Sequence, residues 1–227
     1  MEYEIRGTVL PTLEVELNAG ETIYTESGGM AWMTEGIKMD TNMKGGVLGG
    51  LKRMVSGESL FLVDYTATTP SAYITFTSEF PGNIIANPLK EGEEIILQRD
   101  AFMCAESSVT LDMHFHKRLG AGLFGGEGFF LQRVTGPGIA FAELAGEITE
   151  YSLEAGQTLK LDPGHLAMMD PTVDFNISMV KGIRNVFFGG EGLFLATVRG
   201  PGRVWLQSMP IPNLVRRMIP YLPKAKN

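Results

Sequence analysis

Two histidines separated by one residue form the arrangement in this sequence best suited to chemistry. His114 and His116 stand in the segment HFH, and the geometry of a strand places alternate residues on the same face. Imidazole nitrogens bind zinc and iron, so the two side chains, joined by His165 or by Glu127, could hold a metal ion. Histidines that meet on the surface by chance are the alternative. The metal-site hypothesis therefore depends on His114 and His116.

Three glutamates occupy equivalent positions in a phrase that the chain repeats. One copy, GGEGFFLQRVTGPG, begins at Gly125; a second, GGEGLFLATVRGPG, follows 64 residues later; a third and looser copy reads SGESLFLVDY. Their glutamates are Glu58, Glu127 and Glu191, and three symmetric carboxylates around an axis could bind a cation. Alternatively, each glutamate accepts hydrogen bonds from backbone N–H groups of its own turn.

No further catalytic motif accompanies these residues. The sequence contains no G-x-S-x-G, no C-x-x-C and no H-E-x-x-H segment. An enzyme would therefore have to be a metal-dependent, cupin-like one that uses His114 and His116. We assign no catalytic residue and no cofactor from the sequence.

The elements that would position these residues are short β-strands. The segments SLFLVDY, FFLQRV and LFLATV are rich in aromatic and β-branched residues and too short for helices. A second repeated phrase turns at Gly20, Gly92 and Gly156 between two runs, which is a strand–turn–strand signature. One such unit cannot bury its apolar face alone. The sequence predicts an all-β chain in which three tandem antiparallel repeats form one pseudo-threefold body, over residues 1–82, 83–146 and 147–209, followed by a tail over 210–227.

Glycine-rich apolar segments precede the three glutamates, and the tail PIPNLVRRMIPYLP is predicted to form an amphipathic helix. These segments either cap the ends of their own sheets or form an exposed apolar surface for a protein or a membrane. The candidate interaction residues are Val47, Leu48, Leu51, Lys52, Arg53, Met54, Phe124, Phe187, Leu214, Arg216, Arg217 and Met218.

Composition narrows the classes of partner and the compartment. The 227 residues are 44% hydrophobic and carry a net charge of −7, which opposes nucleic-acid binding because such proteins present a basic stripe. The single cysteine, Cys104, excludes an internal disulfide and reads as a small buried hydrophobe. No signal peptide, transit peptide or membrane span is recognisable. We expect a cytoplasmic protein, with peripheral membrane contact as an open alternative.

The segment GGVLGGLKRMVSGESLF, the repeated GGEG with GPG, and the C-terminal LVRRMIPYLP resemble a known family. It was once called domain of unknown function 124 and is also named after a eukaryotic mitochondrial-biogenesis protein of the altered-inheritance-of-mitochondria set. The resemblance covers nearly the whole chain. It implies a fold similar to the tryptophan RNA-binding attenuation protein, with three tandem units in one chain, and for eukaryotic members a role in organising the mitochondrial inner membrane. It implies no catalytic residues and no RNA binding.

Taken together, these patterns favour a non-enzymatic assembly or scaffold protein that works beside a membrane. We expect a homo-oligomer, because the apolar segments and the tail offer more apolar surface than a solitary body exposes. The cupin-like metal-dependent enzyme is the alternative, and stoichiometric metal held by His114 and His116 would favour it.

Overall fold

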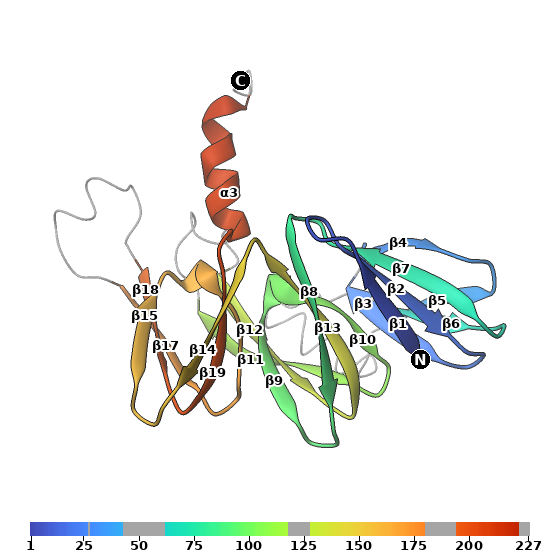
Figure 1. The fold of residues 1–227 in the computed structure, drawn as a ribbon, viewed down its shortest axis with the longest axis horizontal. Coiled ribbons are helices and arrows are strands. Elements are labelled where there is room, and N and C mark those ends of the chain that lie inside the picture. Colours follow the sequence, from blue (N-terminus) through green and yellow to red (C-terminus); the bar gives the residue numbers. More distant parts are fainter. Residues whose placement is uncertain (27, 43–61, 118–127, 180–193, 223–227) are drawn as a thin grey trace. The chain divides into compact units, whose positions relative to one another are not determined.

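The computed structural model describes residues 1–26, 28–42, 62–117, 128–179 and 194–222, and most of them belong to antiparallel β-strands (Figure 1). An α-helix follows the last strand. The predicted all-β class with a short C-terminal helix is therefore confirmed. The chain divides into two compact units, one formed by residues 1–93, 102–110 and 135–143 and the other by 94–101, 111–134 and 144–227. Residues of the second predicted repeat contribute to both units, and the pseudo-threefold arrangement stays a prediction.

The first unit contains two sheets. The four-stranded sheet has the order β1 (Glu2–Arg6), β2 (Thr12–Leu17), β7 (Ala72–Thr77) and β4 (Met30–Met33). The six-stranded sheet has the order β5 (Ile37–Asn42), β6 (Leu62–Ala67), β3 (Thr22–Glu26), β10 (Phe102–Glu106), β13 (Gly138–Ala145) and β8 (Gly82–Leu89).

Alternation in β2 and β7 decides which face of the four-stranded sheet is buried. Leu13, Val15 and Leu17 alternate with Thr12, Glu14 and Glu16, as a strand with one buried face requires. These leucines and Val15 share one core cluster with apolar residues of the six-stranded sheet, including Tyr65, Cys104 and Phe141. The opposite face of the four-stranded sheet therefore carries the glutamates.

The second unit repeats this plan with a six-stranded and a three-stranded sheet. The larger sheet has the order β11 (Thr110–Lys117), β12 (Phe129–Thr135), β9 (Glu94–Gln98), β16 (Leu166–Met169), β19 (Gly202–Gln207) and β14 (Ile148–Leu153). The smaller has the order β15 (Thr158–Leu161), β18 (Phe194–Arg199) and β17 (Asp174–Met179). Their facing residues form a second core that includes Phe129, Leu166, Ile177 and Val198. Cys104, the predicted buried hydrophobe, lies in the first core with no exposed surface.

Three turns at equivalent sequence positions carry the same hydrogen bond. Gly20, Gly92 and Gly156 each lie between two strands with a positive φ, of 90°, 75° and 82°. In each turn the side chain that follows the glycine accepts a bond from the backbone N–H three residues earlier. The pairs are Asn18 N to Glu21 at 2.8 Å, Lys90 N to Glu93 at 2.9 Å and Glu154 N to Gln157 at 3.0 Å. The predicted strand–turn–strand signature is thus present at all three glycines.

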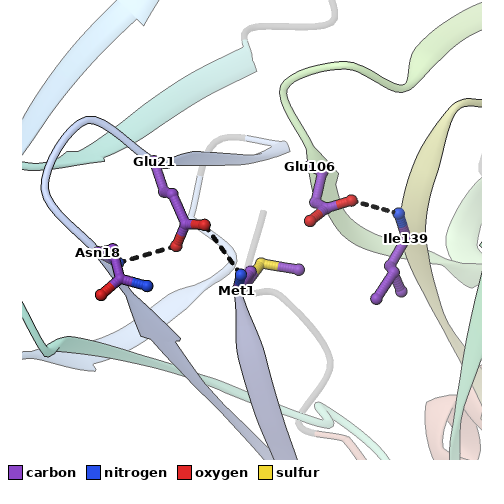
Figure 2. Close-up of polar contacts among 5 residues, drawn as sticks. All are labelled: Met1, Asn18, Glu21, Glu106 and Ile139. Carbon is purple, nitrogen blue, oxygen red and sulfur yellow. Dashed lines mark hydrogen bonds and ion pairs between the residues drawn. The ribbon is translucent and has the colours of Figure 1, made fainter.

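Two later strands begin with a second shared feature. The Ile139 N–H donates to Glu106 Oε2 at 2.7 Å, and 64 residues on the Arg203 N–H donates to Asp170 Oδ2 at 2.8 Å (Figure 2 shows the first pair). Carboxylates that accept backbone N–H groups make strong, charge-assisted bonds. Each bond joins the start of one strand to the end of another: β13 to the last residue of β10, and β19 to the residue just after β16.

The remaining regular elements are short helices. Among the residues that the structure describes, the 3-10 helices are η1 (Arg99–Ala101), η3 (Pro163–His165) and η4 (Ile219–Tyr221), and the α-helix is α3 (Ile211–Met218). Pro212 occupies the first turn of α3, where its missing N–H costs nothing, and Pro220 falls in η4, after the α-helix has ended. The predicted C-terminal helix is therefore confirmed.

Candidate functional site

A pocket of about 530 Å³ opens on the solvent-facing side of the β1-β2-β7-β4 sheet. We call it the acidic–aromatic pocket. Its residues come from all four strands, and the side chains on this face include four carboxylates, one guanidinium and the aromatic rings of Trp32 and Tyr73. The residues are Glu2, Tyr3, Glu4, Arg6, Glu14, Glu16, Trp32, Met33, Thr34, Tyr73 and Thr75. All of them lie in the first unit.

Strand register places these residues in two rows across the sheet. The first row runs from Glu4 to Glu14, Thr75 and Trp32, and the second from Glu2 to Glu16 and Tyr73. Directly opposed side chains in antiparallel strands lie about 5 Å apart at Cβ, and like charges in such positions repel. Each row therefore has an acidic end on β1 and β2 and an uncharged end, which lies on β7 and β4 in the first row and on β7 in the second.

One arginine neutralises part of the acidic end. Arg6 Nη2 lies 2.7 Å from Glu4 Oε2 and 3.0 Å from Glu14 Oε1. The Arg6 guanidinium lowers the pKa of Glu4. In turn, the pKa of Arg6 is raised by its hydrogen bond to Glu4 and by the negative charge of Glu14. In the other row, Tyr73 donates its hydroxyl to Glu16 Oε2 at 3.1 Å, which raises the pKa of Tyr73.

The pocket also contains a buried hydroxyl without a partner. Thr75 is 1% exposed, and its Oγ1 makes no hydrogen bond within the part of the chain that the structure describes. Burying an unsatisfied hydroxyl costs about 1–3 kcal/mol. Its cross-strand neighbour Trp32 remains 55% exposed. The unpaired buried hydroxyl is unusual for a residue whose only task is to hold a sheet together.

Contacts of Met1 help to fix β1, which supplies half of the carboxylates. The Met1 amine donates to Glu21 Oε1 at 2.9 Å, while Glu21 Oε2 accepts the Asn18 N–H (Figure 2). The bond to Glu21 raises the pKa of the Met1 amine, and the Asn18 N–H, together with that amine, lowers the pKa of Glu21. Tyr3 packs edge-on against Phe141, with ring centroids 5.0 Å apart. Glu2 lies between these two anchored residues, and Glu4 directly follows the second.

The predicted metal ligands lie in the second unit. His114 is half-buried on β11, and its Nδ1 lies 3.0 Å from Arg133 Nη2. Because a guanidinium can only donate, Nδ1 accepts. Burial, assisted by the Arg133 charge, lowers the pKa of His114. His165 Nδ1 is bonded to the Gln207 carbonyl at 2.7 Å. Among the side chains that the structure describes, no three His, Cys, Asp or Glu groups are arranged to hold a metal, and the metal hypothesis stays a prediction.

Many of the other predicted residues lie outside the described chain. These are Glu58, Glu127, Glu191, Val47, Leu48, Leu51, Lys52, Arg53, Met54, Phe124 and Phe187, together with the side chains of His116 and Arg216. The structure therefore leaves the three-glutamate site and the glycine-rich contact segments as predictions.

The predicted contact residues of the tail are described. Leu214 and Met218 lie on one side of α3, and Arg217 is exposed on another. Helix α3 projects from the end of β19 and its first turn lies close to η3, where Pro210 packs against Gly164 (Figure 1). The apolar row continues beyond Met218 into Ile219 and Leu222. No helix among the described residues is both long and apolar enough to cross a membrane.

The sequence carried a signal for the acidic–aromatic pocket that motif searching missed. Charged residues alternate as E-x-E-x-R over 2–6 and as E-x-E over 14–16. Alternation at a period of two marks one face of a strand, and charge on that face marks it as solvent-facing. The alternation does not reveal that residues 32 and 73–75 complete the same face.

Comparisons with known proteins agree with the family suggested by the sequence. The family model described as mitochondrial biogenesis AIM24 matches residues 3–209. An uncharacterized protein of Streptococcus pyogenes serotype M6 is 30% identical over 230 residues, covering 98% of this chain and 91% of the relative. A Streptococcus pyogenes protein solved by X-ray crystallography is 27% identical, with a TM-score of 0.78 over 97% of this chain and 99% of that one.

Proposed function

Because the chain belongs to the mitochondrial biogenesis AIM24 family, and its Streptococcus relative is described as uncharacterized, we propose a function from the exposed surface of the fold. The protein is a non-enzymatic assembly protein that associates with further copies of itself through α3. One observation carries this proposal: the apolar side of α3 and η4 faces solvent.

The exposure is large and continuous. Val215, Met218, Ile219 and Leu222 are between 48% and 59% exposed. Met218 and Ile219 follow Val215 by three and four residues, the spacing of a helix face, and Leu222 comes directly after η4. Single exposed apolar residues are ordinary, but a contiguous row on an amphipathic helix marks a contact surface. Each such side chain gains about 1.5–3 kcal/mol when fully removed from water.

A second copy of the chain is the occupant that we propose. Two identical helices can cover each other's apolar rows in an isologous contact, so one surface serves both partners. Charge repulsion does not oppose this contact. The row of Val215, Met218, Ile219 and Leu222 is apolar, and Arg217 lies on another side of the helix. A lipid surface could also accept the row, and the experiment separates the two occupants.

The test compares two single charge changes on the same helix. Val215→Glu places a carboxylate in the apolar row, and burying an unpaired charge in a contact costs several kcal/mol. Asn213→Glu adds the same charge on the opposite side of α3, close to the helix N-terminus, where it is tolerated. Size-exclusion chromatography with light scattering then gives the mass of each.

We expect the unchanged chain and Asn213→Glu to give multiples of the 24.8 kDa chain mass, and Val215→Glu to give the single-chain mass. An unchanged chain that is monomeric at micromolar concentration contradicts the proposal. If that monomer also floats with anionic vesicles, and Val215→Glu does not, the helix serves a membrane instead.

A further inference from the structure

The acidic–aromatic pocket combines features that converge on a positively charged ligand. Four carboxylates meet one guanidinium there, so the pocket is strongly anionic. Arg6 is engaged by Glu4 and Glu14 in one row. In the other row, neither Glu2 nor Glu16 forms an ion pair with a cation among the described residues. The Met1 amine is bonded to Glu21 and attracts Glu2 only at longer range.

The opposition of Glu2 and Glu16 leaves a place for an ammonium group. The two residues are direct cross-strand partners, and like charges in such positions destabilise a sheet. A ligand N–H that donates to both carboxylates replaces that repulsion with two charge-assisted hydrogen bonds. Tyr73 already orients Glu16 through its hydroxyl.

The other end of the pocket is suited to methylene groups and to a second cation. Trp32 presents an exposed indole, whose face attracts cations and covers alkyl chains. Beside it, the buried Oγ1 of Thr75 has no hydrogen-bond partner among the described residues, and it can accept an N–H from a ligand when the side chains that cover it move aside. Thus a hydroxyl that costs free energy in the empty pocket gains a partner in the occupied one.

We propose that this pocket binds a linear aliphatic polyamine, with one ammonium between Glu2 and Glu16 and the chain extending over Tyr73 towards Trp32. Three inter-strand steps of about 4.8 Å separate β1 from β4, about 14 Å in all, which an extended molecule with several amines spans. The volume of about 530 Å³ lies in the range of small-molecule sites. A bare metal ion would use neither the indole nor the space.

The position of the two tryptophans provides a direct assay. Trp205 is 8% exposed and belongs to the second unit, so a Trp205→Phe background leaves Trp32 as the reporter of the pocket. Spermidine is the probe, titrated at constant ionic strength while Trp32 fluorescence and, separately, binding heat are recorded. We expect a saturable change with one site per chain.

Matched variants locate the binding. Glu2→Gln with Glu16→Gln removes two charges from the pocket while keeping its size, and we expect affinity to fall about tenfold or more. Glu91→Gln with Glu147→Gln removes the same charge from exposed positions that do not line the pocket and should leave the affinity within about twofold, because exposed charges outside the site are screened. Circular dichroism of each variant verifies the fold.

Three outcomes overturn the proposal. The first is no saturable response, or an equal loss of affinity in both double variants. The second is displacement of spermidine by Mg²⁺ at equal concentration, which would make the pocket a site for simple cations. The third is tighter binding of a tetralysine peptide than of spermidine, which would make it a peptide site.

Discussion

Two buried threonines with opposite hydrogen-bonding states give the sharpest test of the pocket description. Thr75 and Thr25 are each 1% exposed and both lie in the first unit. Thr25 Oγ1 donates to the Met103 carbonyl at 2.5 Å, whereas Thr75 Oγ1 has no partner among the described residues. Valine matches threonine in shape and suits a strand. The same substitution should therefore have opposite effects at the two positions.

The expected magnitudes follow from the cost of an unsatisfied polar group. Thr75→Val removes a buried hydroxyl that costs about 1–3 kcal/mol, so the free energy of unfolding should rise by about 1 kcal/mol. Thr25→Val removes a satisfied hydrogen bond and should lower it by about 1–2 kcal/mol. For a chain of this length, 1 kcal/mol corresponds to about 2–4 °C in melting temperature.

Guanidinium unfolding with a fluorescence and a circular-dichroism probe measures both changes. Because the two threonines share the first unit, a comparison of them holds even when the units unfold in separate steps. If Thr75→Val destabilises the chain by as much as Thr25→Val does, the Thr75 hydroxyl has a partner. It would then not be a free acceptor for an N–H of the polyamine.

Two further predictions concern the second unit. His114 should titrate below the ordinary histidine pKa because of burial and the Arg133 charge. Its contribution to stability is therefore complete above about pH 6.5 and is lost as the pH falls through the depressed folded pKa. Two-dimensional NMR should show a neutral ring protonated at Nε2, and an Nδ1–H tautomer would refute the assignment. Gly202→Ala should lower the free energy of unfolding by about 1–3 kcal/mol, since the φ of Gly202 is 138° and a Cβ there would lie 2.6 Å from Thr172 Oγ1. Gly156→Ala should cost only about 1 kcal/mol, because the φ of Gly156 is 82° and the nearest atom to its Cβ would be 3.8 Å away. Equal losses of stability in denaturant melts would contradict this steric argument.

Local chemistry made part of the fold predictable from the sequence. Gly20, Gly92 and Gly156 predicted turns because a positive φ favours glycine, and each turn is where the sequence placed it. The spacing of Leu214, Val215 and Met218 predicted a helix in the tail, and Pro220, which cannot continue an α-helix, lies just beyond its end. These features depend on a few neighbouring residues, which is why one sequence sufficed.

Burial in the six-stranded sheets was less predictable. The alternation in IAFAEL is typical of a strand with one solvent-facing side, but Ala140, Phe141 and Ala142 of β13 are all fully buried. Small alanines are compatible with either a buried or an exposed face, so the pattern alone could not distinguish a one-sided strand from a strand covered on both faces.

The acidic–aromatic pocket was unpredictable for a different reason. Its carboxylates come from β1 and β2, but the residues that complete it come from β4 and β7, which pair in the order β2-β7-β4. Pairing between Glu14 and Thr75 joins residues far apart in sequence, and no local pattern specifies that register. The alternating charges identified one face of two strands; the sheet order was needed to make that face a site.

The most direct test of the proposed assembly measures whether the apolar side of α3 is covered in solution. Cys104 is the chain's one cysteine and is fully buried, so a Val215→Cys variant has one reactive thiol, and Arg217→Cys places a matched thiol off the apolar row. Under reducing conditions, thiol-labelling rates are followed over a dilution series. Coverage of the apolar row by a second copy predicts that V215C labels slowly when concentrated and faster on dilution, while R217C labels fast throughout. Fast labelling of V215C at every concentration would contradict it.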